Sequence, residues 1–147
     1  EDYRNGSSNP DIYLYDLSTG TETQITSHTS QQIEPAIHQD KIVWEDYRNG
    51  NSNPDIYLYN LSTGTETQVT NDPSSQYDPD IYGDKIVWYD SRNGTFDVYL
   101  YDFSIGQEIQ ITDHLAEQSA PAIYEDKVVW FDYRNDTIKK RLDSFTL

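Results

Sequence analysis

Alternating aliphatic and aromatic residues form the most regular pattern of the chain. In the run Asp55–Asn60, Ile56 and Leu58 share one face of an extended strand, while Tyr57 and Tyr59 share the other, because side chains alternate along a strand. Both faces are large and mostly apolar, so each must be covered by another part of the fold. The pattern predicts a strand of a sheet that is buried on both sides.

This strand belongs to a unit that recurs along the chain. The unit Asp46–Thr70 returns almost unchanged at Asp2–Thr26 and, altered, at Asp90–Thr112, and its opening Asp-Tyr-Arg-Asn is seen again at Asp132–Asn135. Residues 2–45 and 46–89 are identical at about 31 of 44 aligned positions, which identifies true internal repeats. Three markers advance with the copies: a tryptophan (Trp44, Trp88, Trp130), a proline (Pro35, Pro79, Pro121) and a glycine (Gly20, Gly64, Gly106).

Each full copy predicts four short strands joined by turns. Gly64 supplies a positive φ in one turn, and the third copy is two residues shorter between Arg92 and Asp97, which marks a loop. A four-stranded sheet covered on both faces by its own copies is typical of a propeller blade. The alternative, a β-solenoid, requires shorter coils without hairpin turns. In the middle copy we expect strands at Pro35–His38, Lys41–Asp46, Asp55–Asn60 and Glu66–Thr70.

The repeats divide this all-β chain into blades and half-blades. We expect an outer half-blade at residues 1–27, blades at residues 32–70 and 76–112, an inner half-blade at residues 119–135 and an irregular tail at residues 136–147. The tail has two interpretations. It aligns with a degraded third strand, which matches Leu142 to Leu100 and Phe145 to Phe103, or Ile138, Leu142 and Phe145 form the apolar side of a short helix.

Three blade equivalents do not close a ring by themselves, because propellers close with about four to eight blades. The half-blades would leave bare strand edges, and such edges invite pairing with another chain. One prediction is therefore that two copies share one six-bladed ring under two-fold symmetry. The alternative is a longer chain whose other blades are missing. The absence of Met, at position 1 and elsewhere, indicates a processed chain or a piece of a longer one.

The charge of the chain limits its partners. Its 147 residues include 26 Asp and Glu against 10 Lys and Arg, which gives a net charge of -16. Such a field repels nucleic acids and anionic lipid surfaces, and it favours cations and basic partners. The absence of Cys excludes disulfides, thiolate nucleophiles and cysteine metal sites. No apolar run is long enough to span a bilayer, so we expect neither nucleic-acid binding nor membrane insertion.

The stretch Asp40–Thr70, with the sequence DKIVWEDYRNGNSNPDIYLYNLSTGTETQVT, resembles the WD40-like (PD40) repeat of TolB-type β-propellers. It is similar in particular to tandem repeats of secreted cell-surface proteins from methanogenic archaea, and the resemblance covers residues 1–135. It implies an extracellular or cell-surface propeller that serves as a structural or interaction module. It carries no catalytic set, because the matching residues are framework positions of the family: Trp44, Asp46, Gly50, Asp55, Tyr57, Gly64 and their copies.

The sequence offers few groups for catalysis. His28, His38 and His114 lie at unrelated repeat positions and form no ligand spacing, so we interpret them as solvated residues. No nucleophile elbow, phosphate-binding loop or zinc-protease motif is present. TolB-like propellers that act as pectin lyases rely on His-rich metal sites, and nothing in the chain resembles one. We therefore predict no catalytic, cofactor-binding or metal-binding residue.

One set of acidic residues ends a strand just before an Arg-containing loop. Such a carboxylate can accept the backbone N–H groups of the turn, and the Arg two residues on can pair with it or stack on a Tyr. A calcium loop is the alternative interpretation of Asp46–Gly50, although Arg48 stands where an oxygen ligand is needed. The pairs are Asp2 with Arg4, Asp46 with Arg48, Asp90 with Arg92, and Asp132 with Arg134.

A second acidic set lies on or beside the first strands, which line the channel of a propeller. Glu34, Asp78, Asp80 and Glu117 therefore predict an acidic channel mouth that suits a cation. Tyrosines in loops could stack on sugars, although core packing explains most of them. The sequence thus predicts a non-enzymatic scaffold for protein binding or cell-envelope structure. The alternatives are a carbohydrate-binding module and, less favoured, a polysaccharide-active enzyme.

Overall fold

The structure is a computed structural model that describes residues 9–50 and 52–134. This part of the chain contains twelve strands and no helix, and hence none that is long and apolar enough to cross a membrane. The all-β prediction is confirmed. The strands are β1 (Tyr13–Asp16), β2 (Thr21–Gln24), β3 (Gln32–His38), β4 (Lys41–Asp46), β5 (Asp55–Asn60), β6 (Thr65–Gln68), β7 (Gln76–Tyr82), β8 (Lys85–Asp90), β9 (Asp97–Asp102), β10 (Gln107–Gln110), β11 (Gln118–Tyr124) and β12 (Lys127–Asp132).

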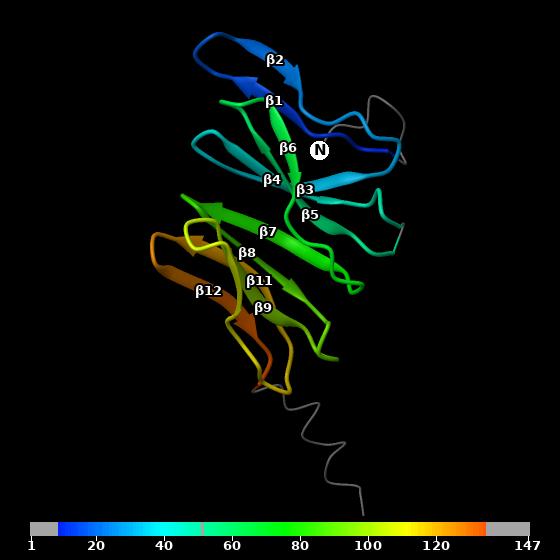
Figure 1. The fold of residues 1–147 in the computed structure, drawn as a ribbon, viewed down its shortest axis with the longest axis vertical. Helices are drawn as coiled ribbons and strands as arrows, with labels where there is room; N and C mark the ends of the chain where they lie inside the picture. The colour runs from blue at the N-terminus through cyan, green and yellow to red at the C-terminus, as the bar shows by residue number, and fades with distance from the viewer. Residues whose placement is uncertain (1–8, 51, 135–147) are drawn as a thin grey trace, which may run out of the picture.

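The strands form four antiparallel sheets that follow one another along the chain (Figure 1). The first blade, β3 to β6, and the second blade, β7 to β10, are four-stranded meanders in which each strand pairs with the next. They are flanked by an N-terminal pair, β1 and β2, and a C-terminal pair, β11 and β12. Trp44 lies opposite Tyr57 in the first blade, and Trp88 lies opposite Tyr99 in the second. The repeated sequences therefore pair their strands in the same register.

The first blade is buried on both faces, as its alternating pattern predicts. One face packs against Ile12, which directly precedes β1, and consists of Ile42, Trp44 and Tyr57. The other face packs against the second blade and consists of Val43, Ile56 and Leu58. The second blade repeats this arrangement, since Val87 and Leu100 pack against Ile123 of β11. The core is thus a series of apolar layers between successive sheets rather than one central cluster.

Among the first strands of the sheets, β7 contacts both β3 and β11, so the three lie on the same side of the molecule, termed here the axial side. Figure 1 shows the sheets following one another from the blue β1 to the orange β12. Both interpretations of the tail at residues 136–147 fall outside the described residues, as do Asp2 and Arg4. The axial side carries the acidic residues that the sequence assigns to a channel mouth.

Candidate functional site at the axial side

The site is built on an irregularity that recurs in the first strands. In β3, β7 and β11 the register with the next strand shifts around an X-Pro pair. Residue X has a positive φ, which is 50° at Glu34, 47° at Asp78 and 47° at Ala120. Few residues other than glycine adopt this conformation, and it persists only where the surrounding structure holds it. The shift takes these residues out of the ladder and sets them on the axial side.

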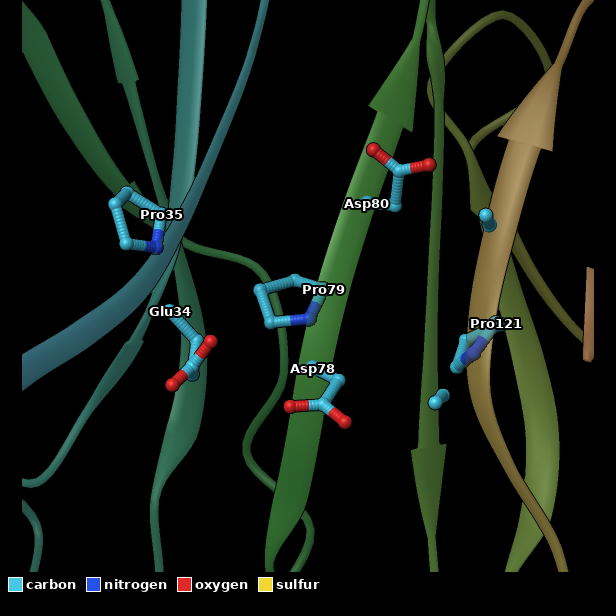
Figure 2. Close-up of a pocket in the computed structure, with 8 residues that line it drawn as sticks. Glu34, Pro35, Asp78, Pro79, Asp80 and Pro121 are labelled. Carbon is cyan, nitrogen blue, oxygen red and sulfur yellow. The ribbon is translucent and has the colours of Figure 1, made fainter. Parts of the chain in front are cut away.

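The three irregular segments surround an open cavity of about 310 Å³. Figure 2 shows Glu34 on β3 beside Asp78 on β7, with Asp80 further along β7. Proline and alanine side chains form the rest of the wall. The structure therefore brings together three of the four acidic residues expected at the channel mouth. Glu117 is not part of the lining, because it precedes β11, where its carbonyl oxygen accepts a 3.0 Å hydrogen bond from the Tyr133 N–H.

Two carboxylates beside the cavity accept backbone hydrogen bonds from the next sheet. Asp80 accepts one from the Ile123 N–H at 2.8 Å. Glu45, at the end of β4, accepts one from the Asp78 N–H at 2.8 Å through Oε1, and its Oε2 accepts one from the Tyr47 hydroxyl at 3.2 Å. Glu45 is only 2% exposed. These bonds connect neighbouring sheets at the point where the cavity opens.

The pKa of Glu45 is raised to about 7, mainly by burial and also by the charges of Asp78 and Glu34, against the lowering effect of its hydrogen bonds with Asp78 and Tyr47. Burial also raises the pKa of Asp78. Sequence reasoning missed Glu45, because the two later copies carry Tyr89 and Phe131 at this position, although Glu1 corresponds to it in the first copy. The sequence nevertheless contained an indication. Glu45 lies two residues after Val43, so its side chain is on the same face of the strand, and the alternating pattern predicts that this face is covered.

An aromatic cluster lies beside these carboxylates. The ring of Tyr77 is 5.5 Å from that of Tyr89 and 6.1 Å from that of Phe96. Burial, followed by the charges of Asp78 and Glu45, raises the pKa of Tyr89 to about 12, so the rings and the carboxylates share one neighbourhood. Acidic groups beside aromatic faces suit cationic ligands. We define the axial mouth as Glu34, Glu45, Asp78, Tyr47, Tyr77 and Tyr89.

The Asp and Arg pairs at Asp46 and Asp90 have the structural role that the sequence predicts. Asp46 is fully buried and accepts hydrogen bonds from the Trp44 indole at 2.9 Å, the Arg48 backbone N–H at 2.9 Å and the Arg48 guanidinium at 2.7 Å. The guanidinium lies 4.3 Å from the ring centre of Tyr57. Asp90 and Arg92 repeat this arrangement. The positive charge beside Asp46 is therefore that of Arg48, in the loop where the alternative interpretation placed calcium.

The histidines cap turns. Nδ1 of His28 accepts the Ser30 N–H at 3.1 Å, and Nδ1 of His114 accepts the Ala116 N–H at 3.0 Å. Asp72 accepts the Ser74 N–H in the same way. His28, Asp72 and His114 thus share one repeat position, and the prediction of unrelated positions was wrong for His28 and His114. The aspartate in the middle copy and the two-residue deletion after it concealed the correspondence.

His38 lies at the other end of its strand from the axial mouth. Its Nδ1 accepts the Gly83 N–H at 2.9 Å, and its ring centre is 4.4 Å from that of Tyr82. Each histidine therefore accepts a hydrogen bond from a backbone N–H group through its Nδ1 atom. Among residues 9–50 and 52–134, no group of three or more His, Cys, Asp or Glu side chains is arranged to hold a metal ion.

Comparison with solved structures supports a TolB-like β-propeller fold. TolB from Acinetobacter baumannii matches with a TM-score of 0.68 and 28% identity, over 84% of this chain and 32% of that one. A TolB-type protein from Agrobacterium tumefaciens matches with a TM-score of 0.72 and 23% identity, over 88% of this chain and 48% of that one. The expected TolB-like fold is thereby supported, while the archaeal origin and the PD40 assignment stay predictions.

Peptidases are also among the similar structures. An acylaminoacyl peptidase from Pyrococcus horikoshii matches with a TM-score of 0.64 and 16% identity, over 83% of this chain and 19% of that one. The chain thus spans less than half the length of each of these three proteins. No protein-family model matches the sequence, and neither does any curated protein.

Proposed function

We propose that the chain forms a non-catalytic β-propeller scaffold that binds polypeptides at the axial mouth. The main observation behind this proposal is that the first strands, β3, β7 and β11, repeat one backbone irregularity around a shared cavity. Carboxylates, prolines and alanines line this cavity. An active site needs unlike catalytic groups that converge on one point, whereas the feature that each copied strand brings to this cavity is the same X-Pro backbone irregularity. The TolB-type resemblance, which implies an interaction module, supports the same assignment.

The chemistry of the axial mouth favours a basic segment of the partner. Glu34 and Asp78 line the cavity, and the chain as a whole carries a net charge of -16. Charge complementarity of this kind mainly sets specificity and the rate of association. Nearby Tyr77 and Tyr89 offer faces on which a Lys or Arg side chain can rest. We propose a polypeptide segment that contains Lys or Arg as the ligand.

Binding to peptide arrays tests this function. We expect peptides rich in Lys and Arg to bind, acidic peptides not to bind, and the affinity to fall with added salt because exposed charges are screened. The double variant Glu34→Gln/Asp78→Asn should bind the selected peptides at least about tenfold more weakly, measured by titration calorimetry. Asn tolerates the positive φ of residue 78, so the variant keeps the backbone.

Asp126→Asn provides the control. It removes a carboxylate charge whose side chain is 87% exposed, in the turn between β11 and β12, and the peptide affinity should stay unchanged. Equal affinity of the double variant and the wild type would show that the axial mouth is not the site. Hits on a glycan array without peptide hits would favour the carbohydrate-binding alternative, and cleavage of the bound peptides would contradict a non-catalytic role.

We also propose a location and an assembly for this scaffold. The resemblance to repeats of secreted cell-surface proteins supports an extracellular or cell-surface location. The three blade equivalents support completion by a second copy, because two such chains give a six-bladed ring. A ring of this kind would place both axial mouths around one central channel.

A further inference from the structure

One apolar contact recurs between successive sheets. Val43 and Leu58 of the first blade cluster with Ile81 of β7, and Val87 and Leu100 of the second blade cluster with Ile123 of β11. Both valines are 0% exposed, and the isoleucines are 4% and 7% exposed. The contact therefore consists of a valine from a second strand, a leucine from a third strand and an isoleucine from the next first strand.

At the N-terminal pair, the leucine and the isoleucine of this contact are present but the valine is not. We term the space between this leucine and isoleucine the socket. Leu14 corresponds to Leu58, and Ile37 corresponds to Ile81. Ile37 is 55% exposed, against 4% for Ile81. Leu14, Ala36 and Ile37 line an apolar cavity of about 140 Å³. In the described residues, β1 pairs only with β2, so no second strand lies at its other edge to supply the valine.

At the C-terminal pair the valine is present but has no socket. Val129 corresponds to Val43 and Val87, yet it is 65% exposed. Phe131, two residues along the same face of β12, is also 65% exposed. Within the described part of the chain, β12 pairs only with β11. The strand that pairs with β4 in the first blade is β5, and residues 11–16 match residues 55–60 at every position except the last.

We infer that a second copy of the chain supplies the missing half of each contact: β12 of one copy pairs with β1 of the other, and Val129 enters the socket between Leu14 and Ile37. The inference rests on the proposed ring and names the surface that closes it. The register of β8 with β9 places Lys85 opposite Asp102, and the corresponding pair is Lys127 with Asp16 of the second copy. Opposite charges at directly facing positions stabilise strand pairing.

A row of rings on the axial side continues across the same boundary. His38 lies 4.4 Å from Tyr82, and Tyr82 lies 5.1 Å from Tyr124. Tyr124 is the last aromatic side chain of this row and is 64% exposed. In the two-chain propeller, His38 of the second copy would be the next side chain and would pack against Tyr124. Two-fold symmetry creates the boundary twice, so that the open edges of β1 and β12 are paired in both copies.

Light scattering of the full chain after size-exclusion chromatography tests the inference. We expect a mass of twice 17.1 kDa for the wild type. Val129→Asp should weaken the dimer by at least about a hundredfold, because an unpaired charge would be buried in the socket. Ile105→Asp introduces the same charge at an exposed site in the turn between β9 and β10, away from β1 and β12, and should leave the mass at that of a dimer. Melting curves verify that both variants fold.

Mixing two variants distinguishes an interface from a general loss of stability. Ile37→Asp should also be monomeric, but a mixture of Ile37→Asp with Val129→Asp retains one intact socket per heterodimer. We therefore expect the mixture to form more dimer than either variant alone. A wild-type monomer at all concentrations, a ladder of larger species, or a mixture no better than its components would overturn the inference. None of these readouts depends on peptide binding, so failure of the proposed function remains distinguishable.

Discussion

Asp90→Ala is expected to lower the free energy of unfolding by about 3 kcal/mol, the lower end of the range for breaking a buried ion pair by removing one partner, because Arg92 is partly exposed and keeps Glu108 as a second partner. Asp90 is fully buried and accepts the Trp88 indole N–H at 3.2 Å and the Arg92 backbone N–H at 3.0 Å. The Arg92 guanidinium, which lies 4.2 Å from the ring centre of Tyr99, would lose its buried counter-ion. Urea denaturation followed by tryptophan fluorescence measures the loss.

The chain contains its own control, because Asp132 has the same motif at the edge of the described structure. Asp132 accepts the Trp130 indole N–H at 3.4 Å and the Arg134 backbone N–H at 2.9 Å, but the Arg134 side chain is 49% exposed. Asp132→Ala should therefore have a much smaller effect. Both variants are compared in the Val129→Asp background, which keeps the chain monomeric. Equal losses would show that the local turn, rather than burial of the charge, determines the effect.

The repeat made the sheets predictable from the sequence. The alternation of Ile56 and Leu58 with Tyr57 and Tyr59 gave the two covered faces, because the period of a strand depends only on local geometry. Gly64 has the positive φ, 68°, that its turn requires. The pairing of Asp46 with Arg48 was predictable for the same reason, since the two residues are two apart and at the end of a strand. Each of these features depends on neighbours in the sequence.

The features of the axial mouth depend on contacts between blades, which no local pattern encodes. The hydrogen bond from the Asp78 N–H to Glu45 joins residues of different sheets. The positive φ of Glu34 and Asp78 precedes a proline, a position that ordinarily favours extended backbone. The later copies also differ here, with Tyr89 and Phe131 at the position of Glu45. Repetition thus identified the framework, and the positions where the copies diverge mark the candidate site.

Raising the pH from about 4.5 to 8 is expected to destabilise the fold through Glu45 by about 3 kcal/mol. Burial raises the pKa of this carboxyl from 4.5 to about 7. Between these values the folded chain keeps a proton that the unfolded chain has released, so stability is full below pH 4.5 and is lost as the pH rises through 7. The raised pKa of Asp78 acts in the same direction. Urea midpoints measured at several pH values would show this trend.

Glu45→Gln isolates the contribution of this one carboxyl. The glutamine amide oxygen can still accept the Asp78 N–H, and its NH₂ group can donate to the Tyr47 hydroxyl, so the hydrogen bonds of the neutral acid are kept. The variant should match the wild type at pH 4.5 and exceed its free energy of unfolding by about 3 kcal/mol at pH 8. Glu125→Gln, at an exposed turn between β11 and β12, controls for the loss of net charge. If the stability of Glu45→Gln changed with pH in parallel with that of the wild type, Glu45 would be ionised in the folded chain. The Asp78 N–H would then donate its hydrogen bond to a charged carboxylate.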